Sequence, residues 1–502
     1  MSEPTKAPAV ARAVKWSAIT TVARFALQLG AQVTLARMLG PGNFGVYGIG
    51  IAILTFAAFL SGGSFSWSLL LMPQVGDEDI RFSITWQLVI GLASAAAIYA
   101  LAPAAAVFFK DVRLQPVVEW MALASLLTAA AAPANCLLQR ELNFKALGLI
   151  QLASYAAGYL AVGIPMALYG HGANALAVAC VVQAALGLVL SYAARPHPLR
   201  PLFSYPGARA TLVTGRAVFC TNVVNWLLNN LDRIIIGRVL NATSVGLYSV
   251  AYNLASIPNV LLLGTLQPTL LAVGSTLQQD RHRLSRAWQQ ALAIVLVLVT
   301  PAAVVAALLS ADLIAILYGA AWTETAWILA LLFLCLPAWA CWGLSTPVLW
   351  NTGRQHQEFL LQLPLLALAA AAWFLLARDG VRAVAVASAC VIVARAVVIV
   401  AAALRALGLR WAIVVHYALR GAGLSMLCAA AVVVGRHTVA PLAMPVVSLL
   451  AGGALAGATA LLMVVARPQW LGRDARSALS NLFPQLGPRW AAPVAAASRS
   501  PR

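Results

Sequence analysis

Apolar residues occur along the chain in runs of about twenty, separated by short polar or charged breaks. An α-helix of this length crosses the hydrocarbon core of a bilayer. The runs are rich in Ala, Leu and Val and do not alternate in polarity, which predicts helices whose backbone hydrogen bonds are satisfied within each segment. The pattern therefore predicts an all-α integral membrane protein.

The breaks place about fourteen predicted spans and divide them into groups. The spans lie near residues 14–37, 44–71, 83–109, 115–139, 146–169, 172–194, 211–238, 244–273, 287–310, 324–350, 357–377, 381–404, 413–435 and 440–466. The predicted domains are an N-terminal tail (1–13), a six-helix bundle (14–194), a linker (195–210), a second six-helix bundle (211–404), an extra helix pair (405–466) and a mostly disordered or surface-lying tail (467–502). Twelve spans are the alternative, because the last two connections carry few charges to fix their topology.

The composition agrees with a lipid environment and orients the chain. Of the 502 residues, 62% are hydrophobic and 9% charged, whereas soluble proteins carry roughly 25% charged residues. With the N-terminus in the cytoplasm, 22 of the 33 lysines and arginines fall on the cytoplasmic side and seven on the other. Basic residues favour the cytoplasmic side, so both termini are predicted to be cytoplasmic, in a bacterial inner membrane. This topology explains the net charge of +19, and no nucleic-acid partner is predicted.

Sequence motifs for covalent chemistry or metal binding are absent. The seven cysteines lie within apolar runs and have no C-x-x-C spacing, which predicts packing residues instead of metal ligands. No Walker A loop is present. A membrane glycosyltransferase or polymerase would need catalytic carboxylates, and the best cluster, Asp77, Glu78 and Asp79, is interpreted as a solvated loop. The chain is therefore predicted to be a transporter with no enzymatic activity, no cofactor and no resident metal.

The chain contains an internal repeat with an offset of 201 residues. Residues 37–47 align with residues 238–248, and Arg, Leu, Gly and Tyr match in register. Six spans separate the two copies, so the two halves have the same orientation, as in transporters that work by alternating access. The predicted turn residues are Gly45 and Tyr47 in the first copy and Gly246 and Tyr248 in the second.

Polar side chains recur inside the first and seventh spans, which are equivalent in the repeat. In the first span they lie four residues apart and share one helix face, and they are Thr20, Arg24, Gln28 and Gln32. The seventh span contains Asn222, Asn225, Asn229, Asp232 and Arg233. An arginine at mid-bilayer costs about 2.5–3.5 kcal/mol to insert, so Arg24 must face protein or water. Arg395 is equally deep, and pairing with Asp232, Glu119 or backbone carbonyls is the structural alternative for these arginines.

Two segments resemble one known family. Residues 228–254, from Leu-Asn-Asn-Leu-Asp-Arg to Ala-Tyr-Asn-Leu, are similar to the signature of Wzx-type polysaccharide flippases. Residues 36–47, Ala-Arg-Met-Leu-Gly-Pro-Gly-Asn-Phe-Gly-Val-Tyr, resemble the first-turn motif of the same family. These flippases form a branch of the multidrug/oligosaccharidyl-lipid/polysaccharide exporter superfamily, which also contains the MATE drug antiporters and the lipid II flippase.

The resemblance implies two parallel six-helix bundles that form a V around a cationic central cavity, with two extra C-terminal helices. It implies a flippase for a polyprenyl-pyrophosphate-linked oligosaccharide in exopolysaccharide, capsule or lipopolysaccharide O-antigen synthesis, coupled to H⁺ or Na⁺. Membrane lipids, a polysaccharide polymerase and a chain-length regulator are the implied partners. The alternative is a MATE-like drug or cation antiporter, which would need carboxylates in its cavity.

The residues of the two polar faces are assigned to this substrate as a hypothesis. Guanidinium groups suit pyrophosphate and amides suit sugar hydroxyls. The pyrophosphate candidates are Arg24, Arg233 and Arg395, and the glycan candidates are Thr20, Gln28, Gln32, Asn222, Asn225 and Asn229. Asp232 is the candidate for ion coupling or for an ion pair.

Overall fold

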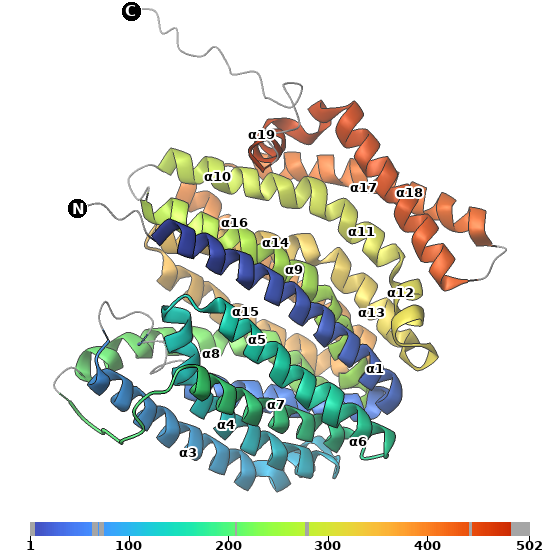
Figure 1. The fold of residues 1–502 in the computed structure, drawn as a ribbon. Helices are drawn as coiled ribbons and strands as arrows, with labels where there is room; N and C mark the ends of the chain where they lie inside the picture. Colours follow the sequence, from blue (N-terminus) through green and yellow to red (C-terminus); the bar gives the residue numbers. More distant parts are fainter. Residues whose placement is uncertain are drawn as a thin grey trace, which may run out of the picture. The chain divides into compact units, whose positions relative to one another are not determined.

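The structure is a computed structural model that describes residues 6–62, 69, 75–205, 208–276, 281–440 and 444–482. Every regular element in these residues is helical (Figure 1), which agrees with the predicted all-α class. The chain folds as two compact units, Met1–Ser249 and Val250–Arg502. Each unit has a buried apolar core of its own.

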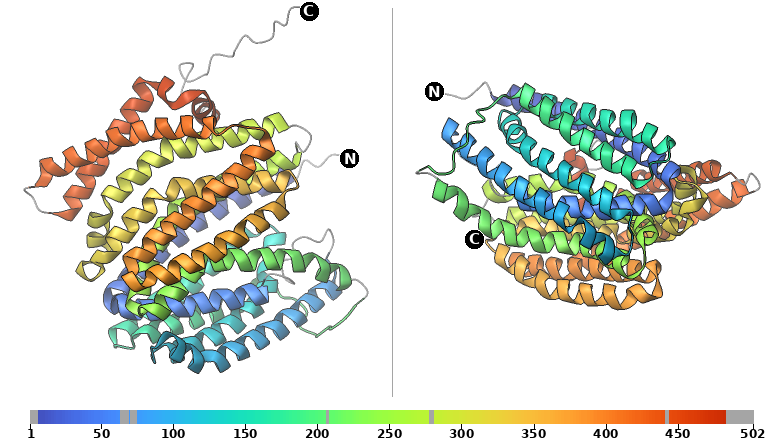
Figure 2. Two further views of the ribbon diagram at one scale, coloured as in Figure 1. Left: turned by 180° about the vertical axis from the view of Figure 1, so that it is seen from behind. Right: turned by 90° about the horizontal axis from the view of Figure 1, so that it is seen from below.

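The first unit is a bundle of long helices. Its elements are α1 (Lys6–Gly62), α3 (Asp77–Phe109), α4 (Leu114–Arg140), α5 (Phe144–Tyr155), the π-helical η1 (Ala156–Gly163), α6 (Ile164–Leu168), α7 (Ala173–Ala194), α8 (Ala208–Val239) and the start of α9 (Ala242–Thr276). Helix α4 packs against α3 and α7, and α1 packs against α4 and α5 (Figures 1 and 2). Small residues allow these close approaches: a Cβ built on Gly91 of α3 would lie 2.6 Å from the Cβ of Ala129 of α4.

Helix α1 joins the first two predicted spans across a sharp kink. Gly40 has φ 72° and ψ 171° inside the helix, a backbone conformation that is essentially restricted to glycine. Pro41 follows and has no backbone N–H to donate. The connection between the spans near 14–37 and 44–71 is therefore a change of direction at one residue and not a loop.

The linker after α7 is held against the start of α3. Nε of Arg81 donates to the carbonyl oxygen of Arg200 at 3.0 Å, and Nε1 of Trp86 donates to that of Phe203 at 3.1 Å. The hydroxyl of Tyr205 donates to Asp79. Asp79 belongs to the acidic cluster 77–79, which forms the first turn of α3 and not the predicted solvated loop. Acidic residues at this position interact favourably with the helix dipole.

The second unit contains the rest of α9 and shorter, more often interrupted helices. They are α10 (Arg281–Ile294), the π-helical η2 (Val295–Val299), α11 (Thr300–Leu308), α12 (Ser310–Leu317), η3 (Ala320–Trp322), α13 (Thr323–Leu334), α14 (Leu336–Asn351), α15 (Gln355–Leu376), η4 (Ala377–Asp379), α16 (Val381–Leu407), α17 (Ala412–Val439), α18 (Pro445–Ala466), η6 (Pro468–Leu471) and α19 (Gly472–Leu482). Helix α16 packs against α14 and α15, and α17 packs against α11. Helices α17 and α18 lie side by side (Figure 1, orange and red).

Eleven helices in the described residues are long and apolar enough to cross a membrane. The number is twelve if the bent pair Ala320–Leu334 and Leu336–Asn351 forms one span. The segment Ile19–Phe56 counts once, although it contains the kink between the first two predicted spans. Helix α8 is not among the eleven, and the side chains of its first part, residues 208–222, lie outside the described residues. The protein is a multi-pass membrane protein, and fourteen spans remain a prediction.

The chain beyond α18 folds back onto the second unit. Helix α19 packs against α10, and Leu471 of η6 and Ala475 of α19 are buried. The hydroxyl of Tyr417 in α17 donates a hydrogen bond to Asp474. The first part of the predicted C-terminal tail is therefore a docked helix, and residues 483–502 lie outside the described part of the chain.

Candidate functional site

Arg24 lies on α1 and faces α5 within the first unit. Its Nη1 donates a 2.6 Å hydrogen bond to Oε1 of Gln151, and the side chain is half-buried. Its Nε is buried and has no hydrogen-bond acceptor among the residues that the structure describes. A buried donor without an acceptor costs about 1–3 kcal/mol. Arg24 is thus a cation at membrane depth with one donor that an anionic ligand can satisfy.

The other residues of the α1 polar face differ in how far they are already bonded. Thr20 is buried, and its hydroxyl donates to the carbonyl oxygen of Trp16 at 2.8 Å. It also packs tightly on α5, because a Cβ on Gly148 would lie 2.4 Å from its side chain. Gln28 and Gln32 are half-buried on the same helix. The two amides are therefore better placed than Thr20 to offer polar groups to a ligand.

The polar residues of α8 divide between half-buried amides and a buried acid. Asn225, Asn229 and Arg233 are half-buried, and the side chain of Asn222 lies outside the described residues. Asp232 is 3% exposed and accepts hydrogen bonds from the Tyr248 hydroxyl at 2.6 Å and from the backbone N–H of Arg233 at 2.7 Å. The structure thus joins the predicted coupling residue to a predicted turn tyrosine.

The two copies of the internal repeat contact each other within the first unit. A Cβ on Gly45 would lie 1.7 Å from the carbonyl oxygen of Ala242, and a Cβ on Gly246 would lie 2.1 Å from that of Pro41. Tyr47 of the first copy is equivalent to Tyr248 of the second. The hydroxyl of Tyr47 lies 2.5 Å from that of Tyr159. The matching glycines are therefore explained by a reciprocal backbone contact.

Arg395 belongs to a buried polar cluster in the second unit. Its Nη2 donates to Oε1 of Gln362 at 2.5 Å, and its guanidinium lies 3.5 Å from the ring centroid of Trp342. Gln362 in turn donates a hydrogen bond to Glu358 at 3.2 Å. Glu358 also accepts a hydrogen bond from Nε1 of Trp350 at 2.8 Å. Arg395 is 4% exposed, so this guanidinium is already stacked, hydrogen-bonded and close to a carboxylate.

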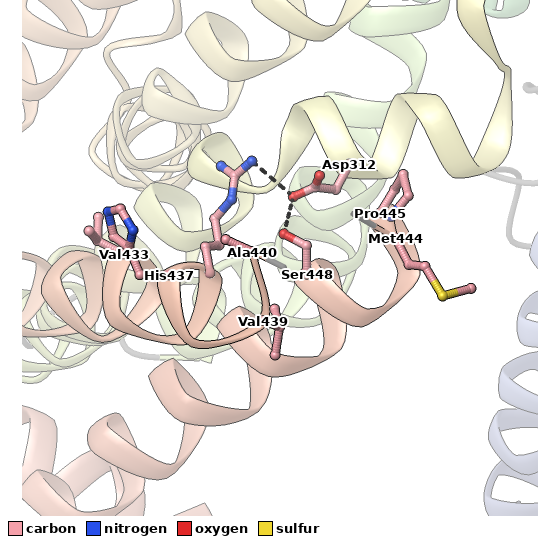
Figure 3. A pocket seen from close by; sticks show the side chains of 9 residues that line it. Asp312, Val433, His437, Val439, Ala440, Met444, Pro445 and Ser448 are labelled. Carbon is pink, nitrogen blue, oxygen red and sulfur yellow. Dashed lines mark hydrogen bonds and ion pairs between the residues drawn. The ribbon is translucent and has the colours of Figure 1, made fainter. Parts of the chain in front are cut away.

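A cavity of about 470 Å³ lies where α17 ends and α18 begins. Asp312 of α12 pairs there with Arg436 at 3.4 Å and accepts a hydrogen bond from Ser448 at 3.0 Å (Figure 3). His437, the next residue of α17, also lines the cavity and lies beside Val433 (Figure 3). Because Asp312 neutralises Arg436, this cavity is a weak candidate for an anion site.

Comparison with known proteins identifies the family. A family model described as polysaccharide biosynthesis protein matches residues 34–327, more than half of the chain. The chain belongs to this family. The match spans residues 36–47 and 228–254 and confirms their resemblance to the Wzx-type polysaccharide family.

Two curated relatives of this polysaccharide biosynthesis protein are similar over about two thirds of their length. The lipopolysaccharide biosynthesis protein WzxC of Escherichia coli K12 is 24% identical over 63% of this chain and 65% of its own. The succinoglycan biosynthesis transport protein ExoT of Rhizobium meliloti 1021 is 26% identical over 66% of this chain and 67% of its own. Among solved structures, the lipid II flippase MurJ in an inward closed conformation has a TM-score of 0.66, with 14% identity over 90% of this chain and 99% of its own. At this identity MurJ shows the fold alone.

The structure adds residues that sequence analysis of this Wzx-type protein missed. Gln151 is the partner of Arg24, and Glu358 with Gln362 surrounds Arg395. The signal was present in each case, because every one of these is a polar residue inside or at the edge of an apolar run. Which arginine each one meets depends on helix packing, which the sequence does not show.

Proposed function

We propose that this protein is a flippase that moves a polyprenyl-pyrophosphate-linked oligosaccharide repeat unit across the bacterial inner membrane. The product would serve exopolysaccharide, capsule or lipopolysaccharide O-antigen assembly, and the protein would catalyse no covalent step. Family membership supports a role in polysaccharide biosynthesis. The names of the relatives, lipopolysaccharide biosynthesis protein and succinoglycan biosynthesis transport protein, support export of a glycan.

The buried Nε of Arg24 is the observation that carries the proposal. A guanidinium binds phosphate oxygens through paired N–H donors, and these charge-assisted bonds are stronger than neutral ones. Gln28 and Gln32 follow at four-residue spacing on α1 and offer amides for sugar hydroxyls. Asn225 and Asn229 offer the same groups on α8. The polyprenyl tail would stay in lipid, since it has no polar group to bury.

Arg395 has a weaker claim on the pyrophosphate than Arg24. It is buried and bonded to Gln362, so binding an anion would require this contact to break. Arg233 keeps its place in the proposal as a half-buried cation of α8.

The proposal includes fourteen spans and cytoplasmic termini. The spans would form two like-oriented bundles that open alternately to the two sides of the membrane. Helical segments lie at each of the fourteen predicted positions, and the kink at Gly40 supports counting α1 as two spans. The excess of basic residues on one side supports the orientation. Coupling to H⁺ or Na⁺, with Asp232 as its carboxylate, and association with a polymerase and a chain-length regulator complete the proposal.

The experiment is complementation of a strain that lacks the gene. Arg24→Ala should lower surface polysaccharide per inserted molecule roughly tenfold or more, since it removes a charge-assisted contact, and lipid-linked repeat units should accumulate in the cytoplasmic leaflet. Arg24→Lys should retain part of the export. Arg200→Ala removes the same charge from an exposed linker position and should export normally. Full export by a normally inserted Arg24→Ala protein would show the assignment to be wrong.

The alternative, a MATE-like drug or cation antiporter, would need carboxylates that can reach a cation. Asp232 is 3% exposed, which leaves no accessible surface for a drug-sized cation. Glu358 already accepts hydrogen bonds from Trp350 and Gln362. The same deletion strain separates the two functions: a flippase changes surface polysaccharide, whereas an antiporter changes drug susceptibility.

A further inference from the structure

A cavity of about 570 Å³ lies at the opposite end of the α17–α18 pair from the Asp312 cavity, where α18 passes into η6. Its lining is amphipathic. Met463 and Ala466, from the last turn of α18, are apolar, whereas Arg467, Gln469 and Trp470 from the following turn bring donors. Arg467 and Trp470 are both exposed, so their side chains are available to a ligand from outside.

Arg420 of α17 shapes this cavity. Its Nη1 donates to the carbonyl oxygens of Gln469 at 3.3 Å and Trp470 at 3.1 Å, which holds η6 across the end of α18. A narrow crevice that contains Arg420 borders on Arg467 and Trp470, which also line the cavity. A charged residue within a predicted span thus positions the backbone that carries the two exposed side chains.

The part of the chain that supplies the cavity, residues 405–482, is strongly cationic. Asp474 is the only acidic residue between positions 405 and 482, and it accepts a hydrogen bond from Tyr417. The arginines of the same stretch that lie outside the Asp312 cavity are Arg405, Arg410, Arg420, Arg467, Arg473 and Arg476. The ligand that fits this charge is an anion.

The helix that leads into the cavity is apolar on its outer face. Leu461, Leu462 and Val465 are each more than 60% exposed, and α18 is among the helices apolar enough to cross a membrane. Tryptophan is enriched where a membrane protein passes from hydrocarbon to headgroups, which is the place that Trp470 takes at the end of α18. A ligand here would meet cationic donors at one end and an apolar helix at the other.

We propose that this cavity binds an anionic phospholipid, with its phosphate on Arg467 beside Trp470 and its acyl chains along the outer face of α18. In the predicted orientation this lipid belongs to the cytoplasmic leaflet. The site is separate from the proposed flippase site, and it can be tested by lipid binding without any export assay.

The test is a lipid titration of the purified full-length protein in detergent, followed by native mass spectrometry. Phosphatidylglycerol should bind more tightly than phosphatidylcholine. Arg467→Ala should weaken phosphatidylglycerol binding about fivefold, the size expected for one basic residue at an anionic membrane surface. Trp470→Ala should weaken binding of the same lipid. Arg405→Ala removes the same charge from an exposed position outside the cavity and should bind like the wild type.

Three outcomes would overturn the proposal. Equal binding of the two lipids would show that the phosphate charge is not recognised. Equal losses in Arg467→Ala and Arg405→Ala, at unchanged melting temperature, would show only a diffuse charge effect. Displacement of phosphatidylglycerol by a millimolar excess of inorganic phosphate would show a site for free phosphate instead of a lipid.

Discussion

Gly45 and Gly246 occupy equivalent positions in the internal repeat, and each leaves room for the backbone of the other copy. The carbonyl oxygen of Ala242 lies 1.7 Å from where a Cβ on Gly45 would be, and that of Pro41 lies 2.1 Å from a Cβ on Gly246. Real Cβ atoms do not approach other atoms this closely, and a backbone carbonyl cannot rotate away as a side chain can. The repeat in the sequence therefore marks a contact in the fold.

Gly45→Ala and Gly246→Ala should each destabilise the protein, because the added methyl group must displace backbone atoms of the other repeat. We expect a loss of about 1–3 kcal/mol, as for other overpacked positions, measured as a lower melting temperature in detergent. Gly30→Ala is the matched control on α1, because nothing lies within 4 Å of its Cβ position and alanine favours the helix. Equal melting temperatures for Gly45→Ala and Gly30→Ala would contradict the reciprocal contact.

Tyr248→Phe should destabilise the first unit by about 1–3 kcal/mol, because it removes a hydrogen-bond donor from a buried carboxylate. Of the two hydrogen-bond donors described above, Asp232 would keep only the backbone N–H of Arg233. Thermal unfolding in detergent measures this loss. Tyr169→Phe, at a tyrosine that is 83% exposed, should melt like the wild type. A Tyr248→Phe protein of wild-type stability would mean that this hydrogen bond contributes nothing to folding.

Arg395→Met should lower stability more than it lowers export per folded molecule. The variant loses the hydrogen bond to Gln362 and the stacking over Trp342, together roughly 2–4 kcal/mol. Melting temperature and export, each normalised to the amount of inserted protein, separate the two effects. Arg378→Met, at an exposed position, controls for the lost charge. Normal melting with export abolished would instead assign Arg395 to the substrate.

His197 should make the stability of the linker depend on pH. The imidazole is buried beside Tyr192, and burial lowers its pKa below the usual value of 6.5. The unfolded state then binds the proton more readily, so stability is complete above pH 6.5 and is lost as the pH falls from there to the lowered pKa. His197→Gln should lose less stability on acidification than the wild type, whereas His171→Gln, at an exposed histidine, should follow the wild type. Parallel wild-type and His197→Gln curves would refute this assignment.

Long-range periodicity was the strongest source of information in the sequence. Runs of apolar residues located the long helices as far as α18, because lipid requires every span to bond its own backbone. The four-residue spacing from Thr20 to Gln32 placed these side chains on one face of a helix, because the direction of a side chain around a helix depends on local geometry alone. The repeat likewise singled out Gly45 and Gly246.

Contacts between helices could not be predicted in the same way. The hydrogen bond from Arg24 to Gln151 joins residues 127 positions apart, and that from Arg395 to Gln362 depends on how α15 and α16 pack. The docking of α19 escaped prediction for a related reason. Its few apolar residues resemble a polar tail in the sequence, and only the folded second unit shows Ala475 in its apolar core and Asp474 bonded to Tyr417.

The kink in α1 also constrains how the gene can diverge. Nothing lies within 4 Å of a Cβ at residue 40, so a larger side chain would have space there. Its φ of 72° combined with a ψ of 171° would nevertheless be strained for any residue with a Cβ. The restriction at residue 40 comes from its backbone torsion angles and not from packing. It would therefore remain even if the sequences of all neighbouring helices changed.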